Sequence, residues 1–269
     1  MSSDTFLGYG NITGLVWRWS PRFLGIALTF VGWFALASVF PQNLMPYPDE
    51  VIYLTWQLYA SGAVFEHLIP TLTRIGLAFA GAMVLGIILG TLMGTRNFAE
   101  MAVSPLIVIG LSVPGVSLAA MATLIFGFSI LAPVSMGIIA VTPFITINVW
   151  KGVSDIDMDL VEMAQAFDVS PLRSIRRIII PNAAPSLFAA ARFGLALSWK
   201  AVTVAEAFAS ADGIGHKILQ TYRAAMLEET WAWAGAFIVL IIIVEYGIFK
   251  PIEQRAFRYR VENQFTLFG

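Results

Sequence analysis

The sequence predicts an all-α protein that crosses a membrane several times, and three observations lead to that fold class. Of the 269 residues, 58% are hydrophobic and only 12% are charged, whereas an average soluble domain has about 25% charged residues. Residues 101–150 contain no Asp, Glu, Lys, Arg or His, and residues 75–95 contain none either. A membrane-spanning helix needs roughly 20 apolar residues. Blocks of this length therefore favour spans over soluble core helices.

The apolar blocks predict six spans, at residues 23–40, 69–95, 102–123, 130–150, 184–209 and 231–249. The third and fourth spans contain four prolines, namely Pro105, Pro114, Pro133 and Pro143. A helix breaker at membrane depth is tolerated where protein or a water-filled cavity lines the backbone. These two spans are therefore expected to be kinked or partly re-entrant, which leaves five or seven spans as alternatives.

The distribution of Lys and Arg predicts that both termini are cytoplasmic. With the N-terminus inside, the inner segments hold Arg18, Arg22, Arg96, Lys151, Arg173, Arg176, Arg177, Lys250, Arg255, Arg258 and Arg260. The outer segments hold only Lys217 and Arg223. Cytoplasmic loops carry the excess of positive residues, so this asymmetry sets the orientation.

The composition excludes several classes of site. The chain has no cysteine and only two histidines, His67 and His216, so we expect no metal site and no catalytic cysteine. The net charge is −1, which gives no basic field for nucleic acid. We divide the chain into an N-terminal segment with the first span and an outer loop (1–66), a core (67–260) and a tail (261–269).

The segment between the fourth and fifth spans predicts two short helices on the inner side, within residues 155–180. The first covers about 157–168, with apolar residues at helical spacing, namely Leu160, Met163, Ala164 and Phe167. The second begins with Ser170 as N-cap and Pro171 at the first helical position. It is expected to stop before Pro181, and it carries Arg173, Arg176 and Arg177.

Residues 162–181 resemble the cytoplasmic loop motif of ABC-importer permeases, which reads Glu-Ala-Ala, three residues, Gly, nine residues, Ile, any residue, Leu, Pro. The residues that match this spacing are Glu162, Ala164, Ile178 and Pro181. The residues that depart from it are Met163, Asp168 and Ile180. Asp168 stands where the motif has Gly, and Asp tolerates a left-handed conformation better than most residues. We therefore expect the turn between the two helices to survive.

The resemblance extends over about residues 67–260. Thr71-Leu-Thr-Arg74 is similar to the entry of the core domain of these permeases, and Pro181 to Pro185 to the start of their next span. Ala205-Glu206 and Gly213-Ile-Gly215 are similar to a pair found in the nitrate, sulfonate and taurine permease group. The chain is thus expected to have the type I ABC importer permease fold, in a bacterial cytoplasmic (inner) membrane.

The resemblance implies a set of partners: a second permease copy, two cytoplasmic ATPase subunits and a periplasmic or surface solute-binding protein. It also implies that the ATPase contacts lie at Glu162, Met163, Ala164, Phe167, Asp168, Ser170 and Arg173. The chain has no GxxxxGK[ST] phosphate loop, so ATP and Mg²⁺ are expected on the partner subunit. This chain is expected to bind no cofactor and to catalyse no covalent step.

Charged residues inside spans are expensive and usually functional. We expect the translocation pathway to include Arg74, Trp199, Lys200 and Glu206. In the alternative interpretation these charges have a structural role only. Each is then paired with another residue of the helix bundle or extends to the membrane–water interface. Arg74 and Glu245 can then pair with each other or with Glu206, and Arg192 fits this alternative better than the pathway.

Together these features predict a permease subunit of an ATP-driven importer for a small anionic solute. The nearest group handles nitrate, bicarbonate, sulfonates or taurine, and Lys200 fits an anion. An ion-gradient-driven secondary transporter is the alternative, but we find no inverted repeat of the kind that class often shows. A membrane enzyme would require clustered His, Cys or carboxylate side chains at one depth, which the sequence lacks.

Overall fold

The computed structural model describes residues 12–157, 163–164, 166–249 and 251, and within this part every regular element is a helix. Four helices are long and apolar enough to cross a membrane: Ala63–Thr95, Leu131–Ser154, Ile180–Ala209 and Leu227–Gly247. A bent pair, Asn97–Ser112 and Gly115–Phe126, makes a fifth if it counts as one span. The prediction of an all-α multi-pass membrane protein is confirmed.

The helices follow the predicted apolar blocks with shifted ends. In chain order they are α1 (Ile12–Val39), α2 (Pro48–Ala60), α3 (Ala63–Thr95), α4 (Asn97–Ser112), α5 (Gly115–Phe126), α6 (Leu131–Ser154), α8 (Pro171–Ser174), α9 (Ile180–Ala209), α10 (Ile214–Arg223) and α11 (Leu227–Val244). Two five-residue π-helical segments, Ile175–Ile179 and Glu245–Phe249, join α8 to α9 and extend α11. The apolar part of α1, Phe23–Val39, is shorter than the four helices that are long enough to cross a membrane.

The predicted third span is broken at Pro114. Helices α4 and α5 meet there at an angle of 99°, because proline cannot donate the backbone hydrogen bond that would continue the helix. The fourth span behaves differently, since α6 runs unbroken through Pro133 and Pro143. The expected irregularity therefore exists, and it is confined to the segment before α6.

The centre of the fold is a tight bundle of α3, α6 and α9, which are the most extensively packed elements. Gly86, Gly90 and Gly94 of α3 lie against α6. A Cβ atom added at Gly90 would sit 2.7 Å from the carbonyl oxygen of Thr146, so these small residues let the two backbones approach closely. Small residues serve the same purpose at many helix contacts in membranes.

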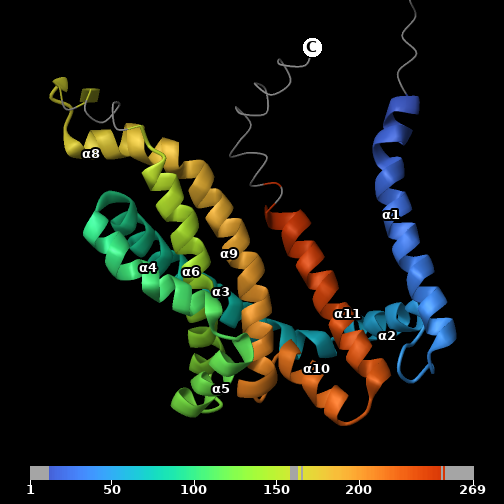
Figure 1. The fold of residues 1–269 in the computed structure, drawn as a ribbon. Helices are drawn as coiled ribbons and strands as arrows, with labels where there is room; N and C mark the ends of the chain where they lie inside the picture. Colours follow the sequence, from blue (N-terminus) through green and yellow to red (C-terminus); the bar gives the residue numbers. More distant parts are fainter. Residues whose placement is uncertain (1–11, 158–162, 165, 250, 252–269) are drawn as a thin grey trace, which may run out of the picture.

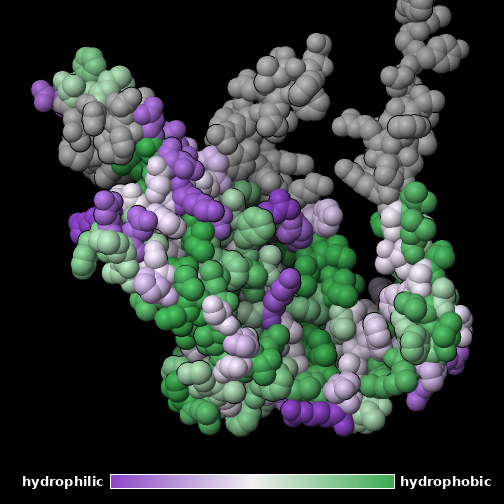
Figure 2. All heavy atoms as spheres, viewed as in Figure 1, coloured by the Kyte–Doolittle hydropathy of each residue, from purple (hydrophilic) through white to green (hydrophobic). Residues whose placement is uncertain are grey.

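Both ends of the bundle carry basic residues. Figure 1 places α8, the described start of α1 and the end of α11 at one end, and α10 at the other. Figure 2 shows hydrophilic residues gathered at these two ends with hydrophobic residues between them. The α8 end carries Arg173, Arg176 and Arg177, whereas the α10 end carries Lys217 and Arg223. The arrangement matches a bundle that crosses an apolar layer.

Helix α2 was not predicted, because the segment 41–66 reads as an outer loop. Its sequence does contain a start signal, since Pro48 opens the helix and Asp49 and Glu50 follow in its first turn. Helix α2 packs on α11, where the Tyr59 hydroxyl donates to the Ala236 carbonyl at 2.8 Å. A Tyr hydroxyl is already protonated at neutral pH, and partial burial raises the pKa of Tyr59 further.

The prediction that the second inner helix stops before Pro181 is wrong. The chain continues through a π-helical segment, Ile175–Ile179, directly into α9. Pro181 stands in the first turn of α9, directly after the π-helical segment. Helices α8 and α9 are therefore joined without a loop.

Candidate functional site

The corner before α8 has the turn that the sequence predicts. Asp168 has φ +53°, a left-handed conformation that Asp accepts more readily than most residues. The Val169 amide donates to the Ala164 carbonyl at 2.9 Å and closes the turn. Ser170 directly precedes α8, and its carbonyl accepts from the amides of Arg173 and Ser174. These bonds fix the direction in which the chain leaves the corner.

The side chains of this corner separate into a buried and an exposed set. Ala164 is buried, whereas Met163 and Phe167 are exposed, Phe167 to 76%. Arg173 is exposed as well. Glu162, the first residue of the motif, lies outside the described residues. An exposed aromatic ring and thioether, with an exposed arginine a few residues further along the chain, are side chains suited to a contact with a protein partner.

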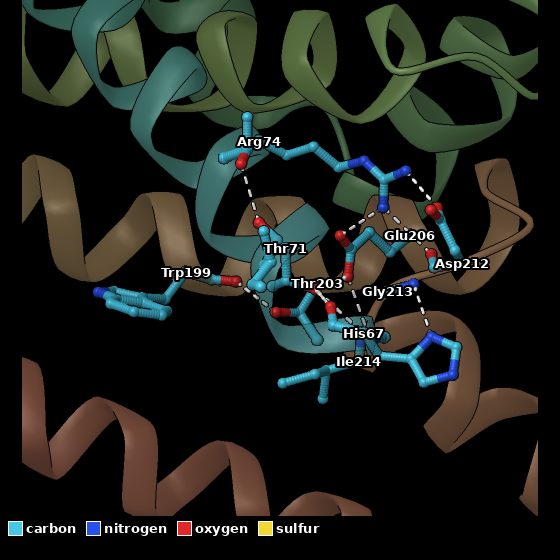
Figure 3. Close-up of polar contacts among 12 residues, drawn as sticks. His67, Thr71, Arg74, Trp199, Thr203, Glu206, Asp212, Gly213 and Ile214 are labelled. Atoms are coloured by element: carbon cyan, nitrogen blue, oxygen red, sulfur yellow. Dashed lines mark hydrogen bonds and ion pairs between the residues drawn. The ribbon is translucent and has the colours of Figure 1, made fainter. Parts of the chain in front are cut away.

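A buried polar cluster joins α3, α9 and the turn before α10 (Figure 3). The Arg74 guanidinium pairs with the Glu206 carboxylate at 2.8 Å and also with the Asp212 carboxylate. Glu206 is 0% exposed and accepts two further bonds, from the Thr71 hydroxyl at 2.8 Å and the Gly215 amide at 3.1 Å. A buried carboxylate with three donors, one of them the Arg74 cation, is well satisfied.

The turn between α9 and α10 is held by the same cluster. The Asp212 carbonyl accepts from Arg74 at 3.1 Å, and the Ile214 amide donates to the Thr71 hydroxyl at 2.9 Å. Gly213 has φ +101°, and a Cβ there would lie 2.5 Å from the Glu206 carboxyl carbon. Gly215 has no room for a Cβ either, because the Thr203 carbonyl oxygen touches that position. Only glycine fits at these two positions.

Lys200 lies elsewhere on α9, at the wall of a cavity between α4, α5, α6 and α9. The cavity has a volume of about 240 Å³ and opens beside the break between α4 and α5. Its described lining is Gly110, Leu111, Val113, Gly115, Leu118, Met136, Ala140, Val141, Phe144, Leu197, Lys200, Ala201 and Val204. Lys200 supplies the one charged side chain of this set, is exposed, and forms no ion pair with any described residue.

The structure thus separates the four residues predicted for the translocation pathway. It brings Arg74 and Glu206 together, as the pairing alternative allowed. It buries Trp199 in an apolar cluster, where the ring meets Phe237 at 5.8 Å, and it leaves Lys200 at the cavity. Arg192 pairs with Glu245 at 2.6 Å near the α8 end, so Glu245 does not pair with Arg74.

The sequence analysis missed Asp212 and the role of His67 in this cluster. The His67 Nδ1 atom accepts from the Gly213 amide at 3.4 Å, and its ring packs on Trp233 at 5.4 Å. The spacing of Thr71 and Arg74 by one helical turn was a usable signal, because both side chains then share a face of α3. Among the described residues no group of three or more His, Asp or Glu could hold a metal ion.

Comparisons with known proteins agree with the motif. The family model of the binding-protein-dependent transport system inner membrane component matches residues 82–258. The chain is 32% identical over 201 residues to the putative aliphatic sulfonates transport permease protein SsuC of Escherichia coli K12, covering 74% of this chain and 76% of that one. It is 28% identical over 236 residues to the nitrate import permease protein NrtB of Synechocystis, with 84% and 82% covered.

Two further matches cover a larger share of the matched protein. The taurine transport system permease protein TauC of Escherichia coli K12 is 23% identical over 263 residues, covering 93% of this chain and 95% of TauC. The inward-facing MetNI methionine ABC transporter matches with a TM-score of 0.59 at 20% identity, covering 72% of this chain and 94% of that chain. An identity this low establishes the fold alone, and that fold is the predicted one.

Proposed function

Because the chain belongs to the family of binding-protein-dependent transport system inner membrane components, we propose that it lines the route of a small anionic solute in an ATP-driven importer. In this proposal two copies of the chain enclose the pore. Two ATPase subunits dock on the cytoplasmic side, and a solute-binding protein docks on the outer side. The chain itself moves a solute and catalyses no covalent reaction.

The inner corner at Asp168 is the observation that supports coupling to an ATPase. Phe167 and Met163 are exposed there, beside the arginines of α8 and the π-helical segment that follows it. The corner continues without a loop into α9, which carries both Lys200 and Glu206. A push on the corner would therefore reach the middle of the bundle through one rigid element.

ATP and Mg²⁺ belong to the partner in this proposal, because the chain has no phosphate-binding loop. The α8 end faces the cytoplasm together with both chain termini, as the Lys and Arg distribution favours. The anionic class of the solute follows from Lys200, a cation at membrane depth without a described counter-charge, since such residues mark solute pathways. The names of two relatives, a putative aliphatic sulfonates permease and a nitrate import permease, point the same way.

The test is a comparison of two exposed phenylalanines. Phe167 is 76% exposed at the corner, and Phe98 is 79% exposed at the start of α4. The tagged full-length chain is purified in mild detergent from its native membrane, co-purified proteins are identified by mass spectrometry, and the eluate is assayed for ATPase activity. Phe167→Asp is expected to lose the ATPase or to uncouple it, because it places a second acid beside Asp168 within the apolar contact.

Phe98→Asp is the matched control and is expected to keep the ATPase. If no ATPase accompanies the wild type in any detergent, the importer proposal is wrong. An ion-gradient-driven transporter would then take its place. If both variants lose the ATPase equally, the contact does not lie at the corner.

A further inference from the structure

The cavity beside Lys200 has the size and lining of a site for a small organic ion. Its volume of about 240 Å³ is below the roughly 300–1,000 Å³ of sites for drug-sized ligands. The described lining is apolar except for Lys200 and backbone groups. Lys200 lies about 14 Å before the end of α9, at about 1.5 Å per residue. Along the helix axis, the cation and the cavity therefore lie far from either end of α9, although the Lys200 side chain is exposed.

We propose that this cavity is a transient site for a monovalent organic oxyanion with a short alkyl part, in the manner of a small alkanesulfonate. The charge of Lys200 is balanced by one negative charge, and the described lining offers no second cation for a dianion. The alkyl part lies against Met136, Phe144 and Leu197, whose burial by apolar atoms is favourable. The proposal rests on the proposed function for the class of solute that reaches the site.

The lining also predicts which anions the site rejects. An aminosulfonate carries an ammonium group, and the described lining contains no Asp or Glu to pair with it. Burying an unpaired ammonium is costly, and Lys200 repels it. A bare inorganic anion such as nitrate forms the ion pair but leaves the apolar wall unfilled. The expected order of affinity is therefore ethanesulfonate, then nitrate, then taurine.

The small residues of the cavity wall set its size. Gly110 lies against the Pro143 ring, where a Cβ would come within 2.8 Å of Cγ. Gly115 stands at the start of α5, and a Cβ there would meet only the Met136 methyl group at 3.5 Å. A larger residue at 110 would displace Pro143, whereas Gly115→Ala is sterically allowed. Gly115→Ala therefore narrows the cavity slightly without moving α6.

The absence of cysteine from the chain makes a direct binding experiment possible. Val204 lines the cavity one helical turn after Lys200, and Val84 is an exposed valine of α3 that does not line it. Val204→Cys and Val84→Cys each give a single thiol. The full-length chain, purified with whatever partners accompany it, is placed in lipid nanodiscs. The rate of labelling by a neutral maleimide is then measured with and without each anion.

Ethanesulfonate is expected to slow labelling at position 204 about tenfold at about ten times its dissociation constant, because only empty sites react. It is expected to leave Val84→Cys unchanged. Taurine differs from ethanesulfonate only by the amino group. It is expected to need an at least about tenfold higher concentration for the same protection, which corresponds to about 1.4 kcal/mol in binding free energy. When Lys200→Met is combined with Val204→Cys, ethanesulfonate is expected to give no protection of the thiol. The combination with Lys200→Arg is expected to keep the protection.

Several outcomes would overturn the proposal. If taurine protects as well as ethanesulfonate, the missing carboxylate does not exclude an ammonium group. If nitrate protects as well as ethanesulfonate, the apolar wall does not contribute to binding. Protection that persists in Lys200→Met would show that Lys200 does not hold the anion. Ala201→Cys, on the same wall, replaces Val204→Cys if that variant does not fold. Binding is read here without ATP, so failure of the importer proposal remains a separate result.

Discussion

Lys200 and Glu206 of α9 lie six residues apart in the sequence, and they differ in burial and in pairing. Glu206 is fully buried and holds Arg74, Thr71 and the Gly215 amide. Lys200 is exposed at a cavity and has no counter-charge among the described residues. From sequence both are simply charged residues within one span, and both were expected in the translocation pathway.

Pairing distinguishes the two charges, and in our proposal it separates a structural charge from a functional one. A buried carboxylate whose oxygens all have donors cannot exchange partners without breaking several bonds. A cation at a cavity can accept a passing anion at little cost. Three substitutions sharpen this contrast, from the largest expected loss of stability to the smallest.

Glu206→Ala is expected to have the largest effect. It leaves the Arg74 cation buried with only Asp212 as a partner, and breaking a buried ion pair by removing one member costs about 3–5 kcal/mol. Unfolding of the purified chain by increasing denaturant in mixed micelles measures the loss. A loss below about 1 kcal/mol would contradict the structural role, and Glu206→Gln, which keeps an acceptor for Thr71, is expected to lose less.

Gly213→Ala is expected to come second. Its φ of +101° is strained for any side chain, and the new Cβ would press on the Glu206 carboxylate. A non-glycine residue held in such a conformation costs about 1–3 kcal/mol. The same unfolding measurement checks it, with Gly62→Ala as control, because Gly62 has φ +80° and open space around it. Similar losses for both would assign the effect to the backbone alone.

Glu245→Gln is expected to have the smallest effect. The Arg192–Glu245 pair is partly exposed, with 45% and 37% of the side chains accessible. Exposed ion pairs contribute about 0–1 kcal/mol, so the unfolding free energy should change by less than about 1 kcal/mol. A loss as large as that of Glu206→Ala would mean that exposure in this chain does not distinguish the two pairs.

Much of the fold could be predicted because apolar length and proline position act locally. The long spans follow from uninterrupted apolar blocks, and the α4–α5 break follows from Pro114. The left-handed Asp168 was predicted from the motif position and from the tolerance of Asp for that conformation. Each of these features depends on a few neighbouring residues.

The features that were missed depend on packing instead. Helix α2 is short and its apolar face is completed by α11, so its own sequence resembles a loop. Helix α10 follows a turn that needs Gly213 at positive φ and a carboxylate from α9. The continuation through Pro181 depends on a π-helical segment that local proline rules do not anticipate.

The candidate site was predicted only in part, because its contacts also depend on packing. Arg74 and Glu206 were singled out as intramembrane charges, but their partner Asp212 lies in a turn, where an acidic residue attracts no notice. Lys200 was also singled out, whereas its cavity arises from α4, α5 and α6 together and has no sequence signature. Sequence therefore identifies the charges, and the three-dimensional packing decides what each one does.

The most direct test of that distinction is the thermal unfolding midpoint of Lys200→Met measured beside Glu206→Ala in the same detergent. A change of 1 kcal/mol moves the midpoint of a chain of this size by about 2–4 °C. The account predicts a drop of at least about 6 °C for Glu206→Ala and less than about 2 °C for Lys200→Met. Equal drops would contradict it, because Lys200 would then be a structural group and its cavity would have no free cation to offer a solute.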